Sequence, residues 1–102
     1  MNYILNAAGN PVAEPDTLKW AMWFSTADRH VARTEISSDI LVSTVFLGVD
    51  HSFGSGPPIL FETMIFGGEL SLEQERYASR AEAVEGHARL VELAHASINS
   101  KV

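Results

Sequence analysis

The stretch PPILFETMIFGG, residues 57–68, decides the fold of this chain. Proline and glycine pairs bound it, and the residues between them are rich in β-branched and aromatic side chains, which is typical of a strand. Apolar residues occupy both of its faces, so we expect this strand to lie in the centre of a sheet. One residue departs from the pattern. Glu62 is a carboxylate in an apolar run, where burial without a partner would be costly.

The segments on either side of this stretch predict an antiparallel meander. Residues 31–37 alternate in polarity, residues 40–49 form a second β-branched run, and the serines and the aspartate between them favour a turn. A loop rich in glycine and proline leads from this hairpin to the central strand. Residues 69–78 are ambiguous, because their charge favours a helix whereas Arg76 and Tyr77 fit an edge strand. We therefore predict three or four strands.

Two helices flank the predicted sheet. TLKWAMWFSTAD, residues 17–28, follows an N-cap at Asp16 or Thr17 and is apolar nearly all round, which predicts deep packing. Ser79 and Glu82 fit a capping box for a second helix that runs to about residue 98. Gly86 interrupts it at a cost of about 1 kcal/mol, which a close approach to the sheet would explain. Its expected inward face is formed by Val84, Ala88, Val91, Ala94 and Ile98.

Together these segments predict an α+β fold. An antiparallel three- to four-stranded sheet packs against the C-terminal helix, and the aromatic-rich helix and a short strand at Tyr3–Leu5 precede it. The whole chain, residues 1–102, is expected to form a single domain, because a chain of this length has no room for a second core.

Composition excludes several classes of function. The chain has no cysteine, which removes disulfides and thiolate metal sites, and no apolar run approaches the roughly 20 residues that span a bilayer. With no signal peptide evident, we expect a cytoplasmic protein that does not contact membranes. A net charge of −6 with seven Lys and Arg argues against duplex nucleic acid as a partner.

Known cofactor motifs do not fit the sequence. The glycines at 54 and 56 are not followed by the Lys and Ser/Thr of a phosphate loop or by a helix. His87 and His95 are eight residues apart, whereas the helical zinc motif uses a spacing of four, so both are expected to be solvated. We predict no metal and no cofactor. His51 beside Asp50 is the one histidine placed where functional groups often lie.

Glu62 leaves two interpretations open. It either pairs with a cation, for which Arg76 on the next strand is the natural cross-strand partner, or it lines a pocket with a raised pKa. Thr63 points to the opposite face of the strand, so the two side chains cannot serve one pocket.

Six segments of the chain resemble a group of small, mostly uncharacterised proteins encoded by tailed bacteriophages and prophages. They are KWAMWF (19–24), VARTEI (31–36), VSTVFLGVDH (42–51), GPPILFETMIFGG (56–68), RYAS (76–79) and EAVEGH (82–87). The chain departs from the group at Ala78 and Arg80, where Ser and Trp are usual. The resemblance implies a phage protein that acts in the host cytoplasm, and it carries over no catalytic residue.

Three functions from different classes follow as hypotheses. The first is a homo-oligomeric binding protein that sequesters an anionic nucleotide immune signal, such as a cyclic nucleotide, as an anti-defence sponge. The second is an inhibitor or phage accessory protein that binds a host protein through an acidic surface. The third, ranked last, is a hydrolase that uses His51, Asp50 and Glu62. The ranking favours a non-enzyme. The candidate ligand-binding residues are Trp23, Arg29, Arg33, His51, Phe53, Glu62, Arg76 and Tyr77.

Overall fold

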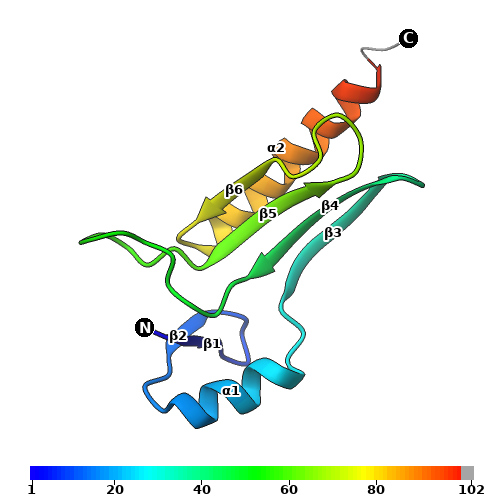
Figure 1. Ribbon diagram of the computed structural model, residues 1–102. Coiled ribbons are helices and arrows are strands. Elements are labelled where there is room, and N and C mark those ends of the chain that lie inside the picture. Colours follow the sequence, from blue (N-terminus) through cyan, green and yellow to red (C-terminus); the bar gives the residue numbers. More distant parts are fainter. Residues whose placement is uncertain (100–102) are drawn as a thin grey trace.

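A computed structural model of the chain describes residues 1–99 and shows an α+β fold of two layers. Strands β3 (His30–Ser37), β4 (Ile40–Phe46), β5 (Phe61–Phe66) and β6 (Gln74–Tyr77) form an antiparallel meander in that order. Helix α2 (Arg80–Asn99) covers one face of this sheet. At one end of the sheet lie helix α1 (Thr17–Thr26) and a small hairpin of β1 (Tyr3–Leu5) and β2 (Pro11–Ala13) (Figure 1).

The predicted meander and its central strands are confirmed. β5 pairs with both β4 and β6, and the ambiguous segment contains the fourth, edge strand. Side chains alternate across the sheet, because successive residues of a strand point to opposite faces. Val42, Thr44 and Phe46 of β4 and the corresponding Phe61, Thr63 and Ile65 of β5 are buried toward α2. The core therefore lies between the sheet and α2.

Ser79 caps α2 as predicted, although the Glu82 carboxylate meets the Ser79 hydroxyl instead of a backbone N–H, and the predicted inward face of α2 is only partly correct. The Ser79 hydroxyl donates to the Glu82 carboxylate at 2.9 Å and accepts from the Glu82 backbone N–H at 3.1 Å. Val84 is 53% exposed and Ala88 is also exposed. Of the predicted face only Ala94 is fully buried, and the residues that meet the sheet are Ala83, Gly86, His87, Leu90 and Ala94.

His87 is buried at the centre of this interface, which corrects the expectation that it is solvated. Its Nδ1 lies 2.7 Å from the Thr44 hydroxyl and its Nε2 lies 2.8 Å from the Thr34 hydroxyl. The Thr44 hydroxyl is in turn 2.5 Å from that of Thr63. Three strands and α2 are thus joined by one buried chain of hydrogen bonds, and burial lowers the pKa of His87. His95 is exposed, as expected.

Helix α1 begins as predicted but packs less deeply than predicted. Asp16 is its N-cap and accepts from the backbone N–H groups of Leu18 and Lys19. No residue of α1 is fully buried, and Leu18 and Met22 are 69% and 65% exposed. Trp20 is half-buried, and its indole N–H donates to the carbonyls of Tyr3 and Gly48. The helix therefore closes one end of the sheet instead of forming a core of its own.

No helix within residues 1–99 is both long enough and apolar enough to cross a bilayer.

Candidate functional site

The first candidate site is an open concavity of about 310 Å³ at the end of the sheet that α1 and β1 close. Three separate segments line it: the turn after β1, the end of α1 with the start of β3, and the first residue of α2. We call it the Trp23–Arg80 pocket. Its lining residues are Leu5, Asn6, Ala7, Gly9, Trp23, Ala27, Asp28, His30 and Arg80.

Arg80 is held against the turn that follows β1. Its guanidinium donates to the Gly9 carbonyl at 3.2 Å. Gly9 has a φ of +81°, and a Cβ at this position would lie 3.3 Å from the guanidinium. A glycine therefore permits both the turn and the close approach of Arg80. The charge of Arg80 adds to the positive end of the α2 dipole, since Arg80 begins that helix.

The aromatic wall of the pocket is braced by the core. The Trp23 ring lies edge-on to the buried Phe46 ring, with 5.9 Å between their centroids and an interplanar angle of 81°. This T-shaped contact is a favoured arrangement of aromatic rings, so the indole is fixed in orientation. Trp23 is nevertheless only half-buried, which leaves part of its surface for the pocket.

Asp28 and His30 form a pair at the mouth of the pocket. The Asp28 carboxylate is 3.0 Å from the His30 backbone N–H and 3.0 Å from its ring Nδ1. The backbone hydrogen bond, and after it the hydrogen bond from the ring, lower the pKa of Asp28. Since Nδ1 is taken by the carboxylate, Nε2 is the ring nitrogen that remains for a ligand.

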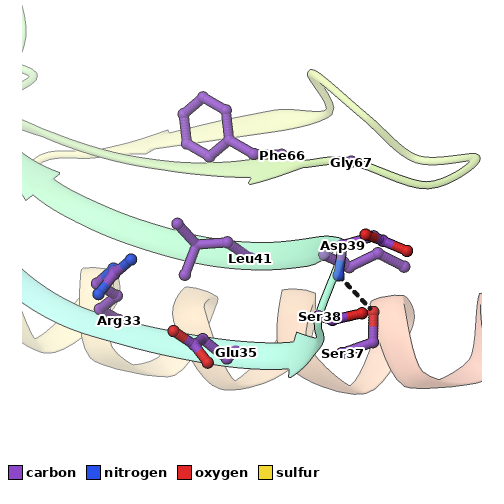
Figure 2. Close-up of a pocket in the computed structure, with 9 residues that line it drawn as sticks. Arg33, Glu35, Ser37, Ser38, Asp39, Leu41, Phe66 and Gly67 are labelled. Atoms are coloured by element: carbon purple, nitrogen blue, oxygen red, sulfur yellow. Dashed lines mark hydrogen bonds between the residues drawn. The ribbon is translucent and has the colours of Figure 1, made fainter.

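The second candidate site is the sheet face opposite α2, which we call the open face. Register places Leu41, Ser43 and Val45 of β4 on it, next to Glu62, Met64 and Phe66 of β5. Arg33 and Glu35 border it along β3, and Gln74 and Arg76 border it along β6. Figure 2 shows Arg33, Glu35, Leu41 and Phe66 on this face, with α2 behind the sheet. A concavity of about 290 Å³ lies there, near the β3–β4 turn.

Glu62 has the predicted cross-strand partner. Arg76 Nε donates to its carboxylate at 2.8 Å, and the two residues are directly opposite on β5 and β6. Thr63 points to the other face, as predicted, and is fully buried. A carboxylate is therefore tolerated in this apolar strand because Glu62 lies on the open face and is paired there with Arg76.

Glu62→Gln is expected to lower the free energy of unfolding by only about 0.5 kcal/mol. The reason is that water screens the ion pair from the Arg76 side, where the side chain is 40% exposed, although the Glu62 side chain is only 14% exposed. Urea unfolding of this variant beside Glu92→Gln, an exposed position on α2, measures the difference. A loss above about 2 kcal/mol would contradict the assignment of Glu62 to a solvent-screened pair.

The predicted ligand-binding residues do not gather in one place. Arg33, Glu62 and Arg76 share the open face, and Trp23 lines the pocket on the α2 side. Arg29 donates to the Phe46 carbonyl at 2.9 Å and stacks on Phe24, so it braces the fold. Tyr77 is buried against α2. His51 and Phe53 lie exposed in the loop between β4 and β5, where Phe53 is 99% exposed.

The residues of the hydrolase hypothesis are engaged elsewhere. The Asp50 carboxylate accepts from the backbone N–H groups of Ser52 and Ile59, each at 2.8 Å, which closes the base of the loop. These two hydrogen bonds, that from Ser52 first, lower the pKa of Asp50. Glu62 is paired with Arg76. Within residues 1–99 no hydrogen bond joins His51 to either carboxylate.

Sequence reasoning did not assign Arg80 and His30 to a site. Fifty positions separate them in the chain, and the fold brings them together because β3 begins at the same end of the sheet at which α2 begins. No motif joins residues so far apart. The capping box at Ser79 marks the start of α2, but it does not report that this start lies against the turn after β1.

The described part of the chain contains no group of three or more His, Cys, Asp or Glu side chains able to hold a metal ion. Comparisons with protein-family models, with curated proteins and with solved structures find no match. The resemblance to phage proteins therefore stays a prediction.

Proposed function

We propose that this protein binds a small anionic molecule with a flat ring system, of the nucleotide class, in the Trp23–Arg80 pocket. In this proposal it acts by retaining the molecule and performs no chemistry on it. The observation that carries the proposal is the placement of an indole and a guanidinium in one concavity, each braced by a separate element. A base stacks on aromatic rings and a phosphate pairs with Arg, so the two groups suit the two halves of a nucleotide.

The volume of the pocket and the net charge of the chain limit the class of ligand that fits. The volume of about 310 Å³ lies at the lower end of small-molecule pockets, which span roughly 300–1,000 Å³. It suits one nucleotide unit. The chain carries −6 overall, so only a ligand whose charge is met locally by Arg80 and by the start of α2 would be retained. Under the resemblance to phage proteins, the fitting cargo is a nucleotide signal of bacterial immunity, such as a cyclic di- or oligonucleotide, of which the pocket would hold one nucleotide unit.

The test is retention followed by release. Purified protein is mixed with cyclic di- and oligonucleotides and with ADP-ribose-type compounds, separated from free ligand and denatured, and the released compound is identified by chromatography. We expect the ligand to be recovered intact. Arg80→Gln should weaken binding about tenfold, because it removes one charge-assisted contact.

A matched control separates the two candidate sites. Arg33→Gln removes the same charge from the open face and should leave affinity unchanged. Circular dichroism and melting confirm that both variants are folded. Absence of retention for every compound would overturn the proposal, and equal weakening by both variants would overturn the choice of pocket. A chemically altered ligand would favour the hydrolase hypothesis instead.

A further inference from the structure

The open face carries an apolar patch that no helix of residues 1–99 covers. Leu41, Val45, Met64 and Phe66 lie on neighbouring strands at the centre of this face, and Phe66 is 44% exposed. Helix α2 packs on the opposite face, and α1 meets the four-stranded sheet through the contact of Trp23 with Phe46, a residue that points to that same opposite face. Figure 2 looks onto one end of the patch, where Leu41 and Phe66 lie side by side. A continuous apolar patch with a charged border is typical of an interface.

The shape of the molecule agrees with a missing layer. Its extents are 52 × 30 × 21 Å and its radius of gyration is 15.0 Å. A compact domain of about 100 residues has a radius of gyration of about 13 Å. The chain is elongated because α1 and the β1–β2 hairpin lie beyond one end of the sheet and α2 extends toward the other end, and it is thin because one helix covers only one face of the sheet (Figure 1). Packing a second layer on the open face would make the assembly more compact.

The charges on the strands of the open face are balanced, although the chain as a whole is acidic. Two arginines (Arg33 and Arg76) and two glutamates (Glu35 and Glu62) border the apolar patch. The whole chain carries −6. Like charges disfavour contact between two copies over most of an acidic surface. On the strands of the open face this repulsion is reduced, because Arg33 and Arg76 offset Glu35 and Glu62, and Asp39 adds one negative charge at the β3–β4 turn.

The positions of these four charges are also self-complementary. The centre of the face lies between Ser43 and Met64, which are paired on β4 and β5. From strand spacings, Arg33 and Glu62 both lie about 7 Å from this centre, on different sides of it. By the same spacings, Glu35 and Arg76 both lie about 10 Å from the centre. One two-fold axis in the plane of the interface, oblique to the strands, therefore places Arg33 over Glu62 and Glu35 over Arg76 of the other copy.

We propose that two copies of this chain form a dimer by packing their open faces together. In this dimer each Glu62–Arg76 pair is extended on both sides, by Arg33 and by Glu35 of the other copy, around an apolar centre. The strands of the two sheets cross at a steep angle, as in orthogonal sheet packing. The Trp23–Arg80 pocket lies on the α2 side of the sheet, so dimerisation and ligand binding are independent claims.

The area of the face predicts a dimer of low affinity. A face about 19 Å wide and about 20 Å long has a footprint of about 400 Å² per copy, to which the relief of side chains adds. Stable interfaces bury about 1,200 Å² or more in total, whereas twice this footprint is about 800 Å², so the flat area alone places the dimer among weak, transient interfaces. Its measurement therefore needs a wide range of protein concentrations.

Sedimentation velocity from about 1 to 500 µM is the test, and we expect the mass to rise from one copy to two. Phe66→Lys should weaken the dimer at least about tenfold, because it replaces the most exposed side chain of the apolar patch with a charge. Leu93→Lys is the matched control, since Leu93 is 47% exposed on the outer surface of α2. Arg33→Glu should weaken the dimer and Lys19→Glu, on α1, should not.

Three results would overturn the proposal. The chain could remain monomeric at 500 µM, which would leave the open face to a different protein. The dimer could survive Phe66→Lys with its affinity unchanged. It could instead be lost in Met22→Lys, which would place the interface on the exposed side of α1. These results test the dimer and not ligand retention. Loss of ligand binding in Arg80→Gln tests the pocket and not the dimer.

Discussion

Gly86→Ala is expected to lower the free energy of unfolding by about 3 kcal/mol, although alanine is the better helix former. A Cβ at residue 86 would lie 2.1 Å from the Tyr77 hydroxyl oxygen, far inside van der Waals contact. Gly86 is buried where α2 crosses the sheet, and the Tyr77 ring fills the space that its missing side chain leaves. Overpacking therefore outweighs the gain of about 1 kcal/mol from helix propensity.

The cause is tested by a double-mutant cycle with Tyr77→Leu. Leucine lacks the outer ring atoms that the new Cβ would meet, so the clash is removed. Tyr77→Leu alone should cost about 2 kcal/mol through lost packing. In its background Gly86→Ala should stabilise by up to about 1 kcal/mol, so the double variant is more stable than either single one.

Urea unfolding followed by circular dichroism measures all four proteins. Ala88→Gly is the control for propensity, since Ala88 is exposed on the same helix and should lose about 1 kcal/mol. Additive losses in the double variant would show that Gly86 and Tyr77 do not meet as described. The Tyr77 hydroxyl has no hydrogen-bond partner within residues 1–99, and burial raises the pKa of its phenol. Tyr77→Leu therefore removes packing with the core and with Gly86 and breaks no hydrogen bond of the hydroxyl.

Gly86 also illustrates what the sequence could and could not predict. A glycine in a helix costs stability, so its presence indicates a close approach, and the structure confirms this. The partner was not predictable, because Tyr77 lies on an edge strand that was itself ambiguous in sequence. The strand order was predictable from alternation, from turn residues and from the doubly apolar run of β5. Cross-strand pairing of Glu62 with Arg76 followed from that order.

The inward face of α2 was not predictable, because small residues occur all around the helix. The expected face was centred on Val84, which is exposed, and Val91, which is only partly buried against the core, whereas the sheet selects the face on which Ala83, Gly86 and Ala94 allow close packing. Hydrophobic periodicity measures apolar content and not the size of the side chain, so the face it favoured was only partly correct. The same error placed His87 in solvent.

The candidate site was less predictable than the fold. Trp23 was identified from its residue type, but it joins Arg80 and His30 only through the closure of the β1–β2 hairpin and α1 over the end of the sheet. The second strand of that hairpin, β2, is not among the predicted strands, because a three-residue strand that begins at a proline carries little pattern. Long-range contacts of this kind leave no local signal.

His87 is expected to make the stability of the protein depend on pH below about 6.5. Burial favours its neutral form, so its pKa is lower in the folded chain than in the unfolded chain. Between these two pKa values the unfolded state binds more protons. The contribution of His87 is therefore complete above about 6.5, falls as the pH drops below it, and is lost once the pH passes below the folded pKa.

The hydrogen bonds of the His87 ring also favour its neutral form. The neutral ring can donate from one nitrogen and accept at the other, which matches the hydroxyls of Thr34 and Thr44. A protonated ring would only donate, and the Thr44 hydroxyl is also hydrogen-bonded to that of Thr63. The direct partners of the ring are thus hydroxyl groups, with no carboxylate among them, so an imidazolium has no counter-charge in contact. Charge at this position is disfavoured by desolvation.

His87→Gln separates the contribution of the hydrogen bonds from that of proton binding, because glutamine also donates and accepts hydrogen bonds but does not titrate. It should cost about 1–2 kcal/mol at pH 7.5 through poorer geometry, and the loss of stability between pH 6.5 and 5 should become smaller. His95→Gln, at an exposed position on the same helix, should change neither quantity by more than about 0.5 kcal/mol. Urea unfolding at half-unit steps from pH 5 to pH 8 measures both the free energy of unfolding at pH 7.5 and its dependence on pH. If the pH dependence of His87→Gln equals that of the wild type, the titrating group lies elsewhere, and the buried chain from Thr34 to Thr63 does not couple proton binding to folding.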